Sequence, residues 1–226
     1  MSAQTLYQQK RMSAADAIGV VMNGDTIVVP TAVGEPPALL TALSEARHGY
    51  RDVRVSQILP VRKYGYFDPD TTEPVRHIAY FFSGISRAGG QEGWTDFIPA
   101  NFSELPELLT RKLIPADVVF SMASPMDEHG YFSLSLAPDY TMAAITQARA
   151  VVLEVNPNVP FANGNCPIHI SQVTALTESE DALMEVGLPK IGPVPDALRK
   201  DGPDLIPGRA PPQVRHRGPP DTVLCQ

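Results

Sequence analysis

Short apolar runs rich in β-branched residues alternate with stretches of helical spacing along most of this sequence, and few folds accommodate such an alternation. Five of the runs are typical of buried strands: Thr26–Val29, Val53–Leu59, His77–Phe82, Val118–Phe120 and Ala150–Val155. Strands that alternate with helices form parallel sheets, because a parallel connection must return across the sheet through a crossover. The sequence therefore predicts an α/β fold with a largely parallel sheet flanked by helices.

The connecting stretches carry helix start signals. Helices are predicted from Ser13 to Val21, from Pro36-Pro37 through Leu43, from Ser103 through Leu113, and from Thr141 to Ala148. We expect the side chain of Asp139 to cap the last of these helices. The segment Ser83–Gly93 is rich in glycine and serine and is predicted to be a mobile loop.

Composition excludes several classes of protein. Of the 226 residues, 43% are hydrophobic and 19% are charged, as in globular proteins. No apolar run approaches the roughly 20 residues of a membrane span, so no membrane association is expected. The formal charge of −7 argues against nucleic acid as a partner. With two cysteines and no apolar segment of a secretory signal, a cytoplasmic location is expected.

The last part of the sequence has a different composition. From Pro189 onward it holds nine of the 23 prolines, and its charge is +2 whereas the preceding part carries −9. Such a proline density does not sustain packed strand–helix units. We therefore predict one domain over residues 1–190 and a proline-rich second segment over residues 191–226.

Candidate functional residues concentrate after the fourth predicted strand. Ser124-Pro125 ends that strand, because proline has no amide proton for a sheet. Asp127-Glu128-His129-Gly130 then places two carboxylates and an imidazole in a tight turn, and Tyr131–Leu136 is extended again. A polar loop at a strand end is a frequent place for a ligand.

Each candidate also has a structural interpretation. Asp127 and His129 could supply acid–base chemistry, but a turn cap and a solvated histidine are favoured. One rigid turn could hardly align Ser124, Asp127 and His129 as a hydrolytic triad. Cys166 and His169 have metal-ligand spacing without a second ligand pair, so no metal is predicted.

The stretch Gly34-Glu35-Pro36 leaves two interpretations open. A glycine loop that enters a helix exposes backbone amides and a dipole that favour an anion, whereas the same residues also suit a plain tight turn. Glu35 would itself repel an anion, so its role would be one of positioning.

Several of these motifs together resemble one family. SPMDEHGYFSL is similar to the S-P-x-D-x-x-G-Y-x-S-L signature of the acetyl-CoA hydrolase/transferase family, in its butyrate and 4-hydroxybutyrate coenzyme A transferase branch. Supporting stretches are Asn23-Gly24-Asp25, Gly34-Glu35-Pro36, Asp96-Phe97-Ile98-Pro99, Phe102–Pro106 and Ile168-His169-Ile170-Ser171. The resemblance runs from about Met12 to about Ile191 and covers the family's N-terminal half.

The resemblance implies an α/β fold like the N-terminal domain of a coenzyme A transferase. It also implies a substrate pocket whose walls include Gly34, Glu35, Pro36, Ser124, Pro125, Asp127, His129, Gly130 and Tyr131. The implied substrates are an acyl-CoA and a short-chain carboxylate, with coenzyme A as substrate and no bound cofactor. The implied protein partner is a second copy of the chain or a separate C-terminal half.

In such transferases a glutamate attacks the acyl-CoA thioester, beside a glycine-rich loop that stabilises the oxyanion. The matching stretch here implies a coenzyme A contact at Gln213, Arg215, Arg217 and Gly218, with both arginines standing where the family has glycine. The glutamate would fall past Gln226, so no catalytic residue is assigned and the chain alone is expected to be inactive. The alternative is a non-catalytic module that binds acyl-CoA or pairs with another subunit.

Overall fold

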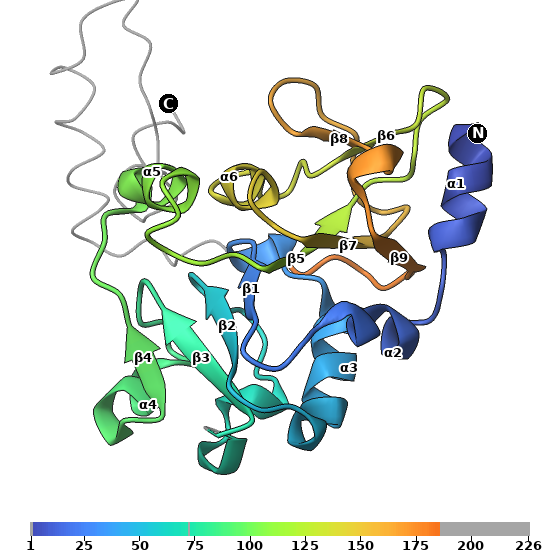
Figure 1. The fold of residues 1–226 in the computed structure, drawn as a ribbon. Coiled ribbons are helices and arrows are strands. Elements are labelled where there is room, and N and C mark those ends of the chain that lie inside the picture. The colour runs from blue at the N-terminus through green and yellow to red at the C-terminus, as the bar shows by residue number, and fades with distance from the viewer. Residues whose placement is uncertain (1, 72, 186–226) are drawn as a thin grey trace, which may run out of the picture. The chain divides into compact units, whose positions relative to one another are not determined.

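The computed structural model describes residues 2–71 and 73–185, nearly all of which belong to the first of two units in the chain, residues 1–183 and 184–226. Their main feature is a seven-stranded parallel sheet with the order β4-β3-β2-β1-β5-β7-β9 (Figure 1). Its strands are β1 Thr26–Val29, β2 Val53–Gln57, β3 Val75–Ala79, β4 Thr95–Phe97, β5 Val118–Ala123, β7 Ala150–Val155 and β9 Ala175–Glu178. Two short antiparallel strands, β6 Tyr131–Ser133 and β8 Pro167–His169, form a second sheet. The predicted fold class is confirmed.

The order of the strands reverses at β1, in the middle of the sheet. From β1 the chain builds outward on one side through β2, β3 and β4, and then returns to add β5 on the other side. Because all seven strands are parallel, the loops that follow β1 and β5 leave the same edge of the sheet at this reversal. In doubly wound sheets ligands bind at such a switch point, outside the carboxyl ends of the strands.

The helices cover both faces of the sheet. Their bounds are α1 Ala3–Lys10, α2 Ala14–Ala17, α3 Pro37–Ala46, α4 Arg87–Glu92, α5 Leu105–Thr110 and α6 Thr141–Ile145. The predicted helix from Ser13 is shorter than expected, because a 3₁₀ turn, Ile18–Val20, replaces its second half. The carboxylate of Asp139 accepts a hydrogen bond from the Thr141 amide at 3.1 Å, as predicted, but Tyr140 is the N-cap residue and α6 ends at Ile145 instead of the predicted Ala148.

Alternate residues of β1 supply the two halves of the core. Ile27 and Val29 pack with the leucines of α3, whereas Val28 packs with Leu105 and Leu109 of α5. All residues of β1, β5 and β7 are buried. Strands that are apolar on both faces explain why continuous apolar runs, and not alternating ones, mark them in the sequence.

The loop predicted over Ser83–Gly93 is wrong for its second half, which forms α4. The glycines that suggested mobility serve close packing: a Cβ on Gly89 would collide with Thr95 and Trp94, and one on Gly90 would collide with the ring of Phe82. Gly93 then ends the helix in the left-handed conformation, with φ of 85°, and its amide bonds to the carbonyl of Gly89.

The predicted boundary at residue 190 and the predicted coenzyme A contacts Gln213, Arg215, Arg217 and Gly218 lie outside the described residues. They remain predictions.

Candidate functional site

Glu35 lies in the loop that follows β1 and is 2% exposed. Its carboxylate accepts hydrogen bonds from the side-chain amide of Gln57 at 2.8 Å, the hydroxyl of Tyr64 at 3.1 Å and the backbone amide of Val61 at 3.4 Å. Burial raises the pKa of Glu35, and these hydrogen bonds offset part of that rise. The side chain thus ties the loop after β1 to the end of β2 and to the loop beyond it.

Gly34 allows that loop to approach the chain before α6. A Cβ at this position would lie 2.6 Å from the Cβ of Ala137 and 3.0 Å from the Cβ of Pro30. Nearby, the Thr31 amide donates to the carboxylate of Asp139 at 3.2 Å. Glycine is needed here for lack of space, which a sequence motif alone does not reveal.

The amides at the start of α3 are already occupied. Glu154, on β7, accepts hydrogen bonds from the amides of Ala38 at 2.8 Å and Leu39 at 3.3 Å, and from the hydroxyl of Ser179 at 2.7 Å. Burial raises its pKa, and the hydrogen bonds counteract part of the rise. The anion that the dipole of this helix favours is therefore a carboxylate of the protein itself.

Sequence reasoning missed Glu154. Its signal was a single acid inside the apolar run Ala150–Val155, since an acid in a buried strand requires donors from elsewhere in the fold.

A hydroxyl network supports the same sheet edge. The hydroxyl of Tyr140, just before α6, donates to the carbonyl of Val29 at 2.6 Å and accepts from the amide of Ile58 at 3.2 Å. It thereby joins the last residue of β1 to the residue that follows β2. Next to it, the hydroxyls of Ser56 and Tyr80 are hydrogen-bonded, and the rings of Tyr80 and Tyr140 meet edge to face at 6.0 Å. Tyr140 was not singled out in the sequence, where it reads as one more aromatic near a helix start.

The turn after β5 is organised by Asp127. One oxygen of its carboxylate accepts from the amides of His129 at 2.9 Å and Tyr131 at 2.8 Å, and Gly130 adopts a φ of 89°. The side chain of His129 is 75% exposed, with Nε2 3.5 Å from the carboxylate of Glu128. The structural interpretation of Asp127 as a turn cap is confirmed.

Ser124 holds the base of this turn. Its hydroxyl donates to the carbonyl of Pro125 at 3.0 Å and accepts from the amide of Ser133 at 2.9 Å. These bonds leave it unconnected to the imidazole of His129, in agreement with the rejection of a hydrolytic triad. Ser124 instead fixes where the chain leaves β5 and enters β6.

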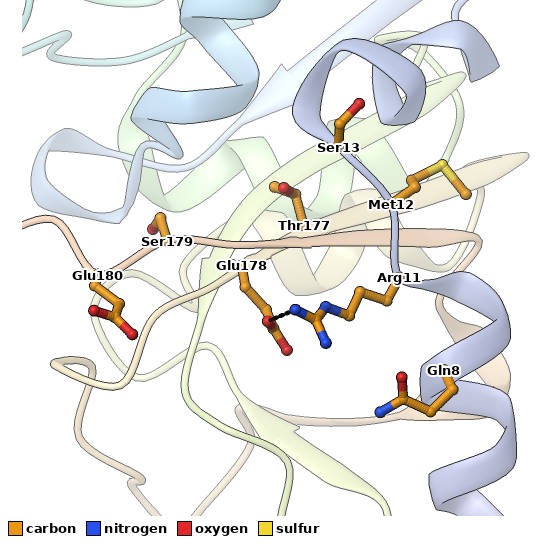
Figure 2. A pocket seen from close by; sticks show the side chains of 8 residues that line it. All are labelled: Gln8, Arg11, Met12, Ser13, Thr177, Glu178, Ser179 and Glu180. Carbon is orange, nitrogen blue, oxygen red and sulfur yellow. Dashed lines mark ion pairs between the residues drawn. The ribbon is translucent and has the colours of Figure 1, made fainter.

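Two adjoining cavities lie between α1, this turn and the end of β9. One, of about 450 Å3, is lined by Gln4, Tyr7, Gln8, Pro125, Met126, Asp127, Glu128 and Glu178. The other, of about 690 Å3, is lined by Gln8, Arg11, Met12, Ser13, Thr177, Glu178, Ser179 and Glu180 (Figure 2).

Acidic groups dominate these cavities. Arg11 is the one lysine or arginine among their lining residues, and it forms a 2.8 Å ion pair with Glu178 (Figure 2). Glu178 also accepts from the hydroxyl of Tyr7 at 2.6 Å. Such a lining suits hydroxyl and amide groups better than a polyphosphate.

The candidate metal ligands have structural roles in the described part of the chain. Nδ1 of His169 contacts the hydroxyl of Ser171 at 2.8 Å and accepts from its amide, capping a 3₁₀ turn, while the thiol of Cys166 donates to the carbonyl of Ala162. No cluster of three or more His, Cys, Asp or Glu that could hold a metal occurs among the described residues. Within the same residues, the helices are too short or too polar to span a membrane.

The structure brings the two predicted loops to one edge of the sheet but gives them different neighbours. Gly34–Pro36 contacts the chain before α6 and the loop after β2, whereas Asp127–Tyr131 turns toward α1 and β8. The candidate site therefore consists of two separate loop regions at the same edge of the sheet, one on each side of the switch point.

Comparison with known proteins agrees with this architecture. The model of the acetyl-CoA hydrolase/transferase N-terminal domain matches residues 1–186. A succinyl-CoA:cyclohexane-1-carboxylate CoA transferase of Geobacter metallireducens is 42% identical over 85% of this chain and 44% of its own length. A 4-hydroxybutyrate coenzyme A transferase of Clostridium kluyveri is 32% identical over 99% of this chain and 52% of its own length.

Solved structures give the same result. RipA from Yersinia pestis superposes with a TM-score of 0.84 at 29% identity, covering 92% of this chain and 51% of that one. A 4-hydroxybutyrate CoA-transferase from Porphyromonas gingivalis gives a TM-score of 0.76 at 28% identity, covering 98% of this chain and 52% of its own. The chain thus spans about half the length of the relatives it matches, and it corresponds to their N-terminal part.

Proposed function

The chain belongs to the acetyl-CoA hydrolase/transferase family through its N-terminal domain, and on that premise we propose that it takes part in the transfer of coenzyme A from an acyl-CoA to a carboxylic acid. The relatives named above are CoA transferases whose names specify succinyl-CoA with cyclohexane-1-carboxylate, and 4-hydroxybutyrate. Because the chain covers about half of each relative, the activity, its substrates and any second subunit all belong to the proposal.

The observation that carries the proposal is the position of the two loops. Gly34, Glu35 and Pro36 follow β1, and Ser124 through Tyr131 follow β5, at the point where the strand order reverses. This is the place where doubly wound sheets bind their ligands. We assign these loops to the walls of the substrate pocket, with Glu35 as a positioning residue and Gly34 permitting close approach.

A second candidate function is a binding domain that performs no chemistry by itself. It is favoured by the surroundings of the glutamates in the matched motifs. Glu35 is buried and accepts three hydrogen bonds, Glu104 caps a helical turn, and Glu128 is exposed beside His129. Acyl transfer to a carboxylate nucleophile needs that carboxylate free and facing oxyanion donors. None of these three is so arranged.

Calorimetric titration with acetyl-CoA, beside a coupled transfer assay with acetate as acceptor, separates the two candidates. Binding with turnover supports a transferase domain that is competent by itself. Binding without turnover supports the binding domain. If neither is seen, the proposal of an acyl-CoA site on this chain fails.

Gly34→Ala tests where the ligand binds. The new Cβ would overlap that of Ala137, so we expect a loss of about 1–3 kcal/mol in stability and weaker acetyl-CoA binding. Gly19→Ala is the matched control, since a Cβ there meets no atom within 4 Å. Equal acetyl-CoA affinities for both folded variants would place the ligand away from this loop.

A further inference from the structure

His77, at the centre of β3, is a titratable side chain that the candidate site does not use. It is 0% exposed, and neither nitrogen of its imidazole has a hydrogen-bond partner among the residues that the structure describes. β3 lies between β2 and β4, so the imidazole is enclosed from both sides of its strand (Figure 1). An imidazole buried in this way is neutral, because its charged form would have neither water nor an acceptor.

A short aromatic segment packs over this imidazole. The rings of Tyr66 and Phe67 contact the ring of His77, and that of Phe67 lies at 4.6 Å. Both residues belong to the 3₁₀ turn Gly65–Phe67, in the connection between β2 and β3, and each is 1% exposed. We call residues 64–67 the aromatic cover.

The backbone of the aromatic cover is held more weakly than a strand of the sheet. Its turn is closed by the bond from the Phe67 amide to the Tyr64 carbonyl, at 3.0 Å. The amide of Gly65 donates to the side-chain hydroxyl of Ser44 on α3, at 3.1 Å. Segments that lie outside the sheet and depend on such bonds open at a lower free energy than the core strands.

Two hydroxyls connect the aromatic cover to the loop after β1. The hydroxyl of Tyr64 donates to the carboxylate of Glu35 at 3.1 Å. The hydroxyl of Tyr66 donates to the side-chain oxygen of Gln57 at 3.4 Å, and the side-chain nitrogen of Gln57 donates to Glu35 at 2.8 Å. The segment that packs over His77 therefore also holds the carboxylate that fixes the loop after β1.

We propose that His77 and the aromatic cover form an acid-sensitive switch, in which protonation of His77 opens the cover, releases Glu35 and loosens the loop after β1. The inference goes beyond the proposed function, because it concerns how firmly one loop of the candidate site is held and not what binds there. In the closed state the imidazole reaches neither water nor an acceptor, so it takes up a proton only when the cover is open. Acid therefore shifts the equilibrium toward the open cover.

The groups that face His77 from the neighbouring elements carry no charge in the closed state. They are Tyr66 and Phe67 of the aromatic cover, Val55 on β2 and Thr95 on β4. Burial raises the pKa of Tyr66, so its hydroxyl stays neutral. A proton on His77 would therefore find no compensating negative charge at these positions.

Charged groups lie around the aromatic cover. Lys63 and Asp68, on either side of it, pair with each other at 2.9 Å and are 66% and 41% exposed, and the guanidinium of Arg47 lies against Gly65. Glu35 acts in the direction opposite to His77: burial raises its pKa, so acid favours the closed state at this carboxyl. The contribution of His77 is therefore the difference between the wild-type chain and a variant that lacks the imidazole.

Hydrogen exchange of the full chain, followed by NMR at pH 7 and pH 5, tests the inference. The amides of Gly65 and Phe67 report on the cover, and those of Gly34 and Glu35 report on the loop after β1. Burial lowers the pKa of His77 to about 3, against about 6.5 in water. From pH 7 to pH 5 the protection factors of the four amides should therefore fall about 25-fold more in the wild type than in His77→Leu.

Two controls accompany this comparison. His48→Leu removes an exposed imidazole from the 3₁₀ turn after α3 and should retain the wild-type pH dependence. The amides of His129 and Tyr131, which bond to Asp127 on the other side of the switch point, should show the same pH dependence in the wild type and in His77→Leu. His77→Phe, which keeps a ring in the core, takes the place of His77→Leu if that variant fails to fold.

Three results would overturn the inference. Equal pH dependence in the wild type and His77→Leu would mean that the cover opens without exposing His77. Protection of the cover amides as strong as that of the β5 and β7 amides would mean that the cover opens only when the whole domain unfolds. A change at Gly65 and Phe67 that does not reach Gly34 and Glu35 would mean that the cover does not control the loop. All of these measurements are made without a ligand, so they are independent of the proposed function.

Discussion

Two groups of buried polar side chains lie on the face of the sheet that α3 covers, and they are built in opposite ways. Near the carboxyl edge, Glu35 and Glu154 each accept hydrogen bonds from three donors. Farther into the sheet, His77 on β3 and Thr95 on β4 are paired in register and are also buried, yet their side-chain polar atoms have no hydrogen-bond partner in residues 2–71 and 73–185. A buried polar group without a partner lowers stability.

The imidazole of His77 is packed as an aromatic ring. It lies 4.6 Å from the ring of Phe67 and 6.3 Å from that of Tyr66, and burial lowers its pKa to about 3. The hydroxyl of Tyr66 reaches Gln57 at 3.4 Å, and Gln57 in turn donates to Glu35. The two groups are thus neighbours. Buried polar side chains have hydrogen-bond partners where they hold loops in place, as Glu35 and Glu154 do. Within the described chain, they lack such partners where a neutral ring, that of His77, fills space in the core.

The largest effect is expected from Glu154→Ala. This change leaves the amides of Ala38 and Leu39 and the hydroxyl of Ser179 without their acceptor, which should cost about 3 kcal/mol in the free energy of unfolding. Urea denaturation measures it. Glu107→Ala, at an exposed acid of α5, is the control and should change stability by well under 1 kcal/mol. A loss below 1 kcal/mol for Glu154→Ala would remove the contrast between the two groups.

His77→Leu should raise the free energy of unfolding at acid pH, whereas Glu154→Ala is expected to lower it. The folded-state pKa of His77 lies below the value of about 6.5 in the unfolded chain, so between these values the unfolded state binds more protons. The contribution of His77 to the free energy of unfolding is therefore fully present above pH 6.5. It falls as the pH drops, by about 2 kcal/mol at pH 5. The variant should lose this dependence, as stability measured from pH 7 to pH 5 would show.

Glu154→Gln provides the matched comparison in pH. The folded-state pKa of Glu154 is raised, so its contribution to stability is present below the unfolded pKa and declines as the pH rises through the folded value. Replacing it should flatten a decline that accompanies rising pH, whereas His77→Leu flattens one that accompanies falling pH. Parallel changes in both variants would mean that other groups control the pH profile.

Thr95→Val and Ser179→Ala compare a hydroxyl that has no hydrogen-bond partner in the described chain with one that has. Removing the hydroxyl of Thr95 loses no hydrogen bond of the described chain, so stability should stay the same or rise by up to about 1 kcal/mol. Ser179→Ala removes a donor to Glu154 and should lower stability by about 1–2 kcal/mol. If Thr95→Val proves the more destabilising of the two, the hydroxyl of Thr95 has a partner, such as a water. The difference between the two groups of buried polar side chains is then smaller.

The sequence was sufficient for five strands of the parallel sheet, but it missed β4 and β9 and was insufficient for the support of the site. Continuous apolar runs such as Ala150–Val155 predict buried parallel strands, because local composition and burial agree there. The partners of Glu154, by contrast, come from α3 and from the chain after β9, and the space around Gly34 is set by Ala137. Such contacts between segments far apart in the sequence have no local signal. The assignment of the loop residues to a substrate pocket stays a prediction.

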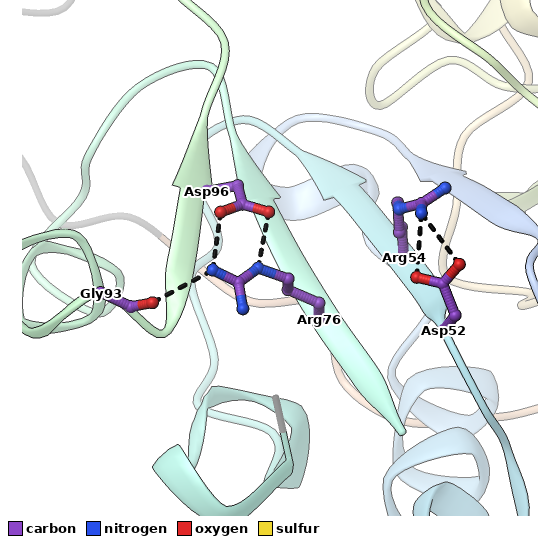
Figure 3. A network of polar contacts seen from close by, with 5 residues as sticks. All are labelled: Asp52, Arg54, Arg76, Gly93 and Asp96. Carbon is purple, nitrogen blue, oxygen red and sulfur yellow. Dashed lines mark hydrogen bonds and ion pairs between the residues drawn. The ribbon is translucent and has the colours of Figure 1, made fainter. Parts of the chain in front are cut away.

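The smallest effect is expected at a third kind of polar group, the ion pair at the surface. Arg76 on β3 donates to both carboxylate oxygens of Asp96 on β4, at 2.5 and 2.7 Å, and to the carbonyl of Gly93, whereas Arg54 and Asp52 pair near the start of β2 (Figure 3). The side chain of Asp96 is 51% exposed, so water screens the attraction. Asp96→Asn should therefore cost under about 1 kcal/mol, and less at high salt, even though its two-point geometry is better than that of most surface pairs. Unfolding at low and high salt measures this. A cost as large as that of Glu154→Ala would show that β4 depends on the Arg76–Asp96 ion pair for its place at the edge of the sheet. It would also show that the hydrogen bonds of a polar group, more than its burial, decide how much the group contributes to the stability of this domain.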